Sequence, residues 1–347
     1  MDQLAGDQEI FEQSKYVVNG FFFSINDDKS ELEVRRYDKC FYISLAPENL
    51  EDSPHMKNEY LRYLDAERSQ ENDHDQLHGT GPEDFYDWAL EPCLHLFETM
   101  APEPEQNHAV TLRDYFYPQV LYYSLHAIDG KLVPIPSKKT NSMKPPGVEL
   151  DDYTFCSVWP SFHPSKVEIC IAGPEDNICP SPSKVLVNGK TVCFFKPYGR
   201  GEVRLALREL ENYRHIEESN LGHDVRICRL YGIVKDDIGR LMGLLLTYID
   251  CDYVTLACAV QADTPASLKQ KWADQVTDTL AQLHQAGIVW GDAKPENVLI
   301  DGSDDAWIID FGGGYTRGFV EKDKAGTVEG DLQGLDNIIK HVFEEKE

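Results

Sequence analysis

The sequence predicts an α+β protein with two domains and a boundary near residue 145. Three observations lead to this prediction. The chain has 347 residues, a length at which two hydrophobic cores are more usual than one. Strand-like apolar runs with turn signals alternate with stretches of helical apolar spacing in both halves. Residues 136–147 combine Pro, Ser, Lys, Thr and Asn with few apolar side chains, which is typical of a linker.

The composition narrows the class of partner and the compartment. The formal net charge is -27, from 60 acidic and 33 basic residues. Such an excess repels phosphate backbones and anionic lipid, so we expect neither a nucleic acid nor a membrane as a partner. The nine cysteines contain no C-x-x-C pair or zinc spacing, which favours reduced thiols in a cytoplasmic protein. We find neither a signal-peptide pattern at the N-terminus nor an apolar run of membrane-spanning length.

The first domain, residues 1–145, reads as a mixture of strands and helices. Strands are expected in the two halves of residues 15–25, around an Asn-Gly turn, and over residues 32–45, 115–128 and 132–135. Helical spacing predicts helices within residues 59–68 and 85–100. His74 and His78 have the i, i+4 spacing of a metal pair, but their polar surroundings favour a solvated loop. An interaction role, a substrate-selecting role and a purely structural role all remain open for this domain.

The second domain, residues 150–347, opens with strands and then becomes more helical. Strands are expected over residues 167–171, 185–187, 191–195, 225–234 and 240–249, and a helix over residues 202–218. Asn188-Gly189 is the signal of a type I′ hairpin. A second helix is expected to be capped by Thr264, with Pro265 as its first residue, and to end at Gly287.

The most informative stretch runs from Gly287 to Gly312. Asp292, Lys294 and Asn297 lie in a turn before the short apolar strand Val298-Leu299-Ile300. A second apolar run, Trp307-Ile308-Ile309, leads to Asp310-Phe311-Gly312. Carboxylate and amide oxygens are the hard donors that Mg²⁺ prefers, and a lysine beside them can neutralise phosphate charge. Chemistry that depends mainly on positioning and charge neutralisation, such as phosphoryl transfer, uses residues of these types.

These residues resemble the catalytic loop and the metal-binding Asp-Phe-Gly of the protein-kinase superfamily, whose loop reads H-R-D-L-x-x-x-N. The resemblance implies ATP and Mg²⁺ as cofactors. It implies that Asp292 orients the acceptor hydroxyl and that Lys294 neutralises charge on the transferring phosphoryl group. It also implies that Asn297 and Asp310 bind the metal. The fold it implies is a two-lobed protein-kinase-like fold with a truncated C-lobe, preceded by an α+β N-terminal domain.

The same resemblance extends to the nucleotide pocket. Lys196 ends the second strand of the predicted hairpin, like the lysine of V-A-I-K. Its partner in the family is a Glu on the following helix, and Glu209 fits that place best. Glu211 is the rival, but two positions are about 200° apart around a helix, so only one of them can face Lys196. Leu246 would then lie at the back of the pocket, and Thr247, Tyr248 and Ile249 would form the hinge beside adenine.

Several departures from the family pattern keep alternatives open. Trp290-Gly291 replaces His-Arg before Asp292. The pair Gly291-Asp292 is closer to the kinases that phosphorylate aminoglycosides and choline, while the following Lys294-Pro295-Glu296-Asn297 resembles the protein-kinase form. Residues 173–182 hold one Gly and three Pro where the family has a Gly-rich loop. The segment from Gly312 to Gly330 is short, and Asp331 resembles the helix residue that braces the catalytic loop. We expect transfer of the γ-phosphoryl group to a Ser/Thr of a protein; the alternatives are a small-molecule kinase and a pseudokinase that only binds.

Regulation is expected to differ from that of many protein kinases. In those enzymes phosphorylation orders a long activation segment through Arg–phosphate pairs. Here Thr316 and Thr327 lie in a short segment with acidic neighbours, which would repel an added phosphate. We therefore expect that phosphorylation of these threonines does not regulate the activity of the site.

Overall fold

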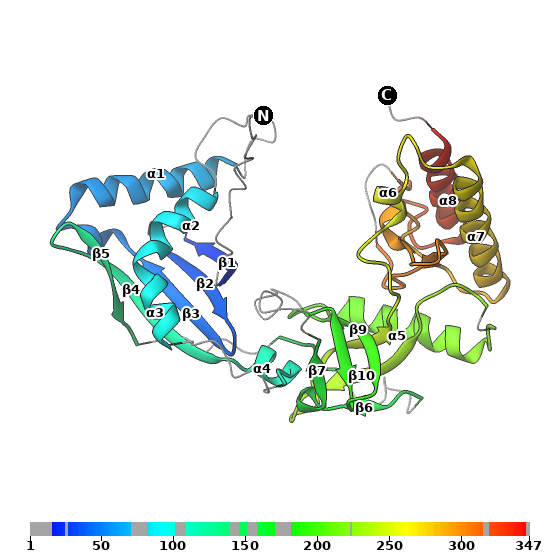
Figure 1. Ribbon diagram of the computed structural model, residues 1–347, viewed down its shortest axis with the longest axis horizontal. Helices are drawn as coiled ribbons and strands as arrows, with labels where there is room; N and C mark the ends of the chain where they lie inside the picture. Colours follow the sequence, from blue (N-terminus) through cyan, green and yellow to red (C-terminus); the bar gives the residue numbers. More distant parts are fainter. Residues whose placement is uncertain are drawn as a thin grey trace, which may run out of the picture. The chain divides into compact units, whose positions relative to one another are not determined.

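The computed structural model describes residues 16–24, 27–70, 82–100, 109–138, 146–150, 158–170, 182–222, 224–314 and 319–344. The chain folds into two compact units (Figure 1). The first unit is Met1–Pro145 with Cys170–Pro182, and the second is Pro146–Ile169 with Ser183–Glu347. The predictions for His74, His78 and most of residues 173–182 fall outside the described residues.

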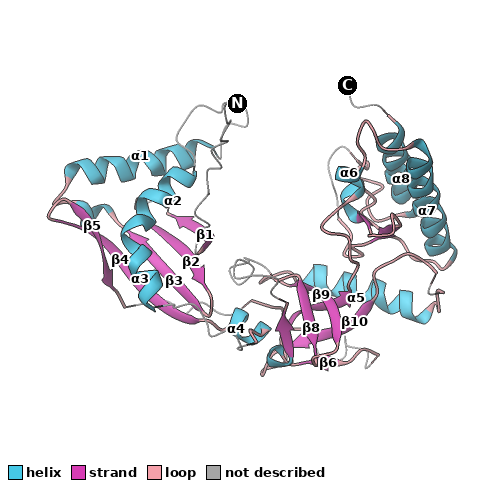
Figure 2. Cartoon of the chain, in the orientation of Figure 1, coloured by secondary structure: helices cyan, strands magenta, loops and turns pink. Residues whose placement is uncertain are grey.

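The first unit is a five-stranded sheet with three helices on one face (Figure 2). The strands follow the order β1-β2-β3-β4-β5: β1 (Val17–Phe23), β2 (Ser30–Arg36), β3 (Lys39–Leu45), β4 (Gln119–Ile128) and β5 (Lys131–Pro136). The helices are α1 (Pro54–Gln70), α2 (Pro82–Leu90), α3 (Leu94–Met100) and a short α4 (Leu112–Phe116). Only the β3–β4 pair is parallel among these strands, and the helical segment provides the crossover that such a pair requires.

Two strand predictions for this unit are wrong, and the strand predicted over residues 115–128 begins too early, because α4 extends to Phe116 and β4 begins at Gln119. Residues 17–23 form one strand, because Asn19-Gly20 lies at a β-bulge and not at a turn. Residues 32–45 form parts of two strands, because the chain turns at Tyr37-Asp38 with Tyr37 at a φ of 50°. The predicted helix over residues 85–100 is interrupted by a 3₁₀ turn at Glu91–Cys93, where Pro92 lacks an amide hydrogen for a continuous helix.

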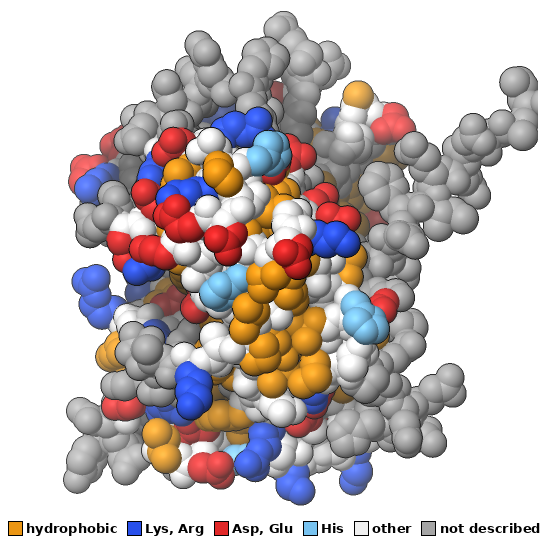
Figure 3. Space-filling view, turned by 90° about the vertical axis from the view of Figure 1, so that its left-hand side faces the viewer, with side chains coloured by type: hydrophobic (Ala, Val, Ile, Leu, Met, Phe, Trp, Pro, Cys, Tyr) orange, Lys and Arg blue, Asp and Glu red, His pale blue; other side chains and the backbone are white. Residues whose placement is uncertain are grey.

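Figure 3 shows one face of the molecule, the left-hand side of Figure 1. Hydrophobic side chains gather near the centre of this face, with Asp and Glu side chains above them. The exposed large hydrophobic residues of the first unit are Phe22, Leu94, Met100, Tyr117, Val120 and Ile128. Their exposure contrasts with the closed core between helices and sheet, which includes Phe41, Tyr60, Phe85 and Phe97.

The second unit combines a six-stranded sheet with a helical part. The strands follow the order β6-β10-β11-β9-β8-β7: β6 (Ser161–Phe162), β7 (Val167–Ile169), β8 (Lys184–Val187), β9 (Thr191–Pro197), β10 (Leu230–Lys235) and β11 (Leu241–Thr247). The helices are α5 (Val203–Glu218), α6 (Leu256–Ala259), α7 (Ala266–Gln285) and α8 (Val328–Phe343), and β12 (Val298–Ile300) pairs with β13 (Ala306–Ile308). Among the described residues, none of the helices combines the length and apolar character needed to cross a membrane.

Local predictions for this unit are largely confirmed, with two corrections. Asn188 and Gly189 have φ values of 51° and 63°, as a type I′ turn requires. Gly287 follows α7 with a φ of 76°, the left-handed conformation that ends many helices. However, Pro265 is the N-cap of α7, because the hydroxyl of Thr264 accepts from the amide of Gln261 and not from the helix. The strand expected over residues 225–234 is the shorter β10.

A single buried cluster connects the sheet of the second unit with its helical part. It contains Leu246 from β11, Tyr213 from α5, Leu280 from α7 and Ile338 from α8. Trp290 and Phe311 are fully buried within it. These two residues flank the predicted site, so its loops rest directly on the core.

Candidate active site

A cavity of about 350 Å³ lies in the second unit, bounded by the six-stranded sheet and by residues that follow β11 and β13. Its wall is mostly apolar and includes Phe194, Cys228, Leu246, Tyr248, Ile249, Leu299 and Ile309. Thr247 also lines it, so all four residues expected beside a nucleotide base do so. Lys196 and Asp310 add charge to the lining. Burial raises the pKa of Cys228 to about 11, so this thiol is a neutral part of the wall.

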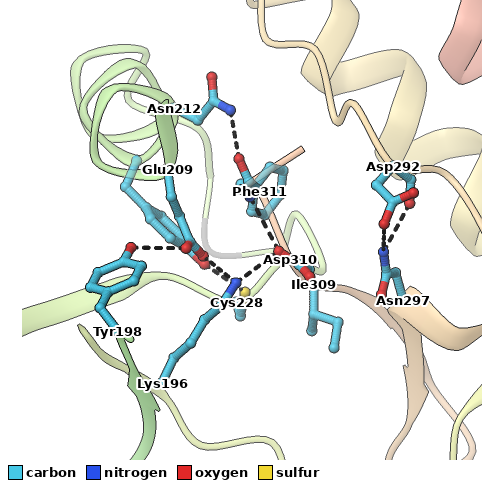
Figure 4. Close-up of polar contacts among 12 residues, drawn as sticks. Lys196, Tyr198, Glu209, Asn212, Cys228, Asp292, Asn297, Ile309, Asp310 and Phe311 are labelled. Atoms are coloured by element: carbon cyan, nitrogen blue, oxygen red, sulfur yellow. Dashed lines mark hydrogen bonds and ion pairs between the residues drawn. The ribbon is translucent and has the colours of Figure 1, made fainter. Parts of the chain in front are cut away.

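Lys196 joins two carboxylates from distant parts of the chain (Figure 4). Its Nζ lies 2.8 Å from Oε1 of Glu209 on α5 and 2.8 Å from Oδ1 of Asp310. Burial by itself would lower the pKa of Lys196, but the two carboxylates outweigh it and the pKa is raised. The ammonium group therefore stays charged at the wall of the cavity.

Glu209 is the α5 glutamate that faces Lys196. Its side chain is 0% exposed, and its Oε2 accepts a hydrogen bond of 2.9 Å from the hydroxyl of Tyr198. Glu211, two positions further along the helix, instead pairs with Arg214 and His215. The separation around the helix thus decides which glutamate reaches the site.

The residues that were predicted to form a catalytic loop meet beside a short 3₁₀ turn, Pro295–Asn297. Lys294 Nζ lies 2.8 Å from Oδ2 of Asp292. Asn297 donates from Nδ2 to the backbone oxygen of Asp292 at 2.9 Å and to its Oδ2 at 3.0 Å (Figure 4). Asn297 is buried, which fixes the loop against the core. Asp292 is therefore held by a cation on one side and an amide on the other.

Asp331, at the start of α8, fixes the position of this loop through hydrogen bonds. It is 1% exposed and accepts from the amides of Trp290 and Gly291 at 2.7 Å each. His284, in the last turn of α7, lies 2.9 Å from its Oδ2. The loop is also tied to the strand end before Asp310, because Trp290 Nε1 donates to the backbone oxygen of Ile309 at 2.8 Å.

The residues around Asp310 connect the loop with α5. Phe311 is fully buried, and its ring packs edge-on against Tyr213 with centroids 5.6 Å apart. Asn212 donates to the backbone oxygen of Phe311 at 2.6 Å (Figure 4). Asp310 itself has a φ of 62°, a left-handed conformation that Asp and Asn tolerate better than most residues. The helix and the Asp-Phe-Gly segment are thus fixed to each other.

Sequence reasoning missed Tyr198, Asn212 and Arg208. The guanidinium group of Arg208 lies against Gly313, where an added Cβ would come within 2.3 Å of its Cζ. It also lies close to Gly326, where the distance to Nη2 would be 2.6 Å. The run Gly312-Gly313-Gly314 was the available signal for this close approach. Tyr198 and Asn212 carried no signal, because their roles depend on contacts across the fold.

The oxygen atoms of Asn297 and Asp310 suit a metal ion that a bound ligand also coordinates. The described residues contain no cluster of three or more His, Cys, Asp or Glu side chains that could hold a metal alone. Asn297 turns its amide nitrogen toward Asp292, which leaves Oδ1 as a donor. Asp310 uses Oδ1 for Lys196 and for the amide of Gly312, which leaves Oδ2. Two oxygen donors fit Mg²⁺, because this ion usually completes its shell with water and phosphate oxygens.

A comparison with known families matches the part of the chain that holds Asp292, Asn297 and Asp310. Residues 200–330 match the family described as protein kinase domain. A stretch of 129 residues is 27% identical to "Cyclin-dependent kinase F-4" from Oryza sativa subsp. japonica. This match covers 36% of the present chain and 26% of the relative, so the chain corresponds to about a quarter of that protein.

Proposed function

Because residues 200–330 place this chain in the protein-kinase superfamily, we propose that it is an ATP- and Mg²⁺-dependent phosphotransferase. The proposed reaction transfers the γ-phosphoryl group of ATP to a hydroxyl group, with a Ser or Thr of a protein as the acceptor. The observation that carries the proposal is the pairing of Lys196 with both Glu209 and Asp310 at 2.8 Å, beside the cavity. We further propose residues 150–347 as the kinase-like domain and residues 1–145 as a separate α+β domain.

Each residue has a specific task in this reaction. The cavity wall at Leu246, Thr247, Tyr248 and Ile249 binds the base, and Lys196 binds phosphate oxygens. Asn297 and Asp310 hold Mg²⁺, which supplies positive charge against the phosphates when bound.

Asp292 accepts the proton of the acceptor hydroxyl. The hydroxyl oxygen then forms a bond to the γ-phosphorus while the bond to the β–γ bridging oxygen breaks, which leaves ADP. Lys294, 2.8 Å from Asp292, neutralises charge on the transferred group.

The cysteines bear on the compartment. The seven cysteines in the described part of the chain are all free thiols. Free thiols suit a reducing compartment, and we propose the cytoplasm.

The test is a transfer assay with the full chain. Purified protein is given ATP with Mg²⁺ and two acceptor panels: Ser/Thr peptides, and small hydroxyl compounds such as an aminoglycoside and choline. We expect phosphate incorporation into the peptides, reduced about 100-fold or more in Asp292→Asn. Transfer only to small compounds would indicate a small-molecule kinase. Nucleotide binding without any transfer would indicate a binding module, and full turnover by Asp292→Asn would contradict the assignment of the base.

A further inference from the structure

Glu209 has a second partner besides Lys196. Both of its carboxylate oxygens are bonded, Oε1 to Lys196 and Oε2 to the hydroxyl of Tyr198. Glu209 is 0% exposed and Tyr198 is 1% exposed. Burial, followed by the nearby charge of Glu209, raises the pKa of Tyr198 far above its ordinary value, so the phenol remains a hydrogen-bond donor. A buried carboxylate depends on such donors, because an unmet oxygen carries the full cost of its lost hydration.

The backbone of Tyr198 fixes the phenol to the sheet. Its amide donates to the backbone oxygen of Met242 in β11 at 2.9 Å. Its own backbone oxygen accepts from the amide of Gly147 at 3.0 Å. Tyr198 therefore connects the rigid sheet directly to Glu209 on α5.

The two partners of Glu209 differ in what else they bind. Lys196 is shared with Asp310, and both of these groups are the ones a nucleotide and its cation would use. The hydroxyl of Tyr198 has Glu209 as its only hydrogen-bond partner among the described residues. Hence the Tyr198–Glu209 bond persists whether Lys196 contacts Asp310 or phosphate.

We propose that Tyr198 is a positioning residue that holds Glu209, and with it α5, in the orientation that pairs with Lys196 before any nucleotide binds. The helix then needs no added phosphate to reach this orientation. The inference rests on the proposed function for its consequence, which is tighter binding of ATP with Mg²⁺. Its structural part, the fixed position of α5, is independent of that function.

The test uses Tyr198→Phe, which removes only the hydroxyl. Amide hydrogen exchange of residues 203–218 is measured without nucleotide, and we expect it to be at least fivefold faster in Tyr198→Phe. Tyr213→Phe is the matched control, because it removes an equally buried hydroxyl on α5 that contacts Cys228 and not Glu209. Circular dichroism verifies the fold of each variant. Unchanged exchange in Tyr198→Phe, or equal acceleration in Tyr213→Phe, would overturn the proposal.

A calorimetric cycle measures the consequence for nucleotide binding. We expect Tyr198→Phe to weaken ATP–Mg²⁺ binding about tenfold, or ~1.4 kcal/mol, and Tyr213→Phe to change it less than twofold. In a Glu209→Gln background, Tyr198→Phe should have little further effect, because the two act as one unit. Additive losses would overturn the proposed route through Glu209. If the wild-type chain bound no nucleotide, the proposed function would fail, and hydrogen exchange would still decide the role of Tyr198.

Discussion

The carboxylate of Asp331 accepts a hydrogen bond of 2.7 Å from the amide of Gly291, the residue immediately before Asp292. The same carboxylate accepts from Trp290. One buried side chain at the start of α8 thus determines the path of the loop that carries Asp292. The position of the Asp292 carboxylate depends on the packing of α8, although no α8 residue lines the cavity.

Asp331→Asn should therefore damage both stability and turnover. An amide side chain has one oxygen acceptor, so at least one of the two loop amides loses its partner. We expect the free energy of unfolding to fall by about 1–3 kcal/mol and phosphate transfer to fall at least tenfold. Thermal unfolding and the transfer assay measure these effects. The control is Asp336→Asn, an exposed position on the same helix, and an equal loss in that variant would count against the bracing role.

We expect Gly334→Ala to lower the free energy of unfolding, although this substitution usually raises it within a helix. Alanine in place of glycine inside a helix normally stabilises it by about 0.5–1 kcal/mol. At Gly334, however, an added Cβ would lie 2.5 Å from the backbone oxygen of Ala293, the residue after Asp292. We expect a loss of about 1–3 kcal/mol from overpacking, together with reduced turnover.

Asp336→Ala is the matched control for Gly334→Ala, since it raises helix propensity at an exposed position of α8. Denaturant unfolding of both variants decides the matter. A stabilised Gly334→Ala with normal turnover would show that α8 does not press on the loop.

Thr327 should act as a helix cap and not as a phosphorylation switch. Its hydroxyl accepts from the amide of Gly330 at 3.1 Å at the start of α8. We expect Thr327→Ala to lose about 1 kcal/mol of stability, and Thr327→Asp to keep the cap. Turnover per folded molecule should stay within about twofold of wild type in both, by the transfer assay.

The same expectation extends to Thr316, which lies outside the described residues. We expect the variant with alanine at both Thr316 and Thr327, and phosphatase-treated wild-type protein, to retain turnover. A loss above tenfold in either, with normal circular dichroism, would show that phosphate in this segment controls the site.

The sequence predicted the site better than the first unit. The α+β, protein-kinase-like fold class is confirmed. The sequence could predict it because Asp292, Asn297 and Asp310 lie in an order and spacing that few folds share. The choice of Glu209 rested on the family resemblance, and helix geometry allowed only one of Glu209 and Glu211 to face Lys196. The structure pairs Glu209 with Lys196. Such local rules act between residues that are close in sequence or tied by a known motif.

The contacts that escaped prediction depend on the fold as a whole. Tyr198 and Asn212 act through residues 11 and 99 positions away, and no periodicity reports such distances. In the first unit, the turn at Tyr37 carries no glycine or proline, so residues 32–45 resembled a single strand. The Asn-Gly pair at residues 19–20 predicted a turn where the structure has a β-bulge, since a bulge uses the same residue types as a turn.

Calorimetric titration of the full chain with ATP, with and without Mg²⁺, tests the central claim most directly. We predict binding of ATP that Mg²⁺ strengthens in the wild type, because Asn297 and Asp310 hold the cation only together with phosphate oxygens. Asp310→Asn should bind ATP weakly and lose the gain from Mg²⁺, while Asn still tolerates the φ of 62° at this position. Absence of binding to the wild type at millimolar ATP with Mg²⁺ would contradict the nucleotide site.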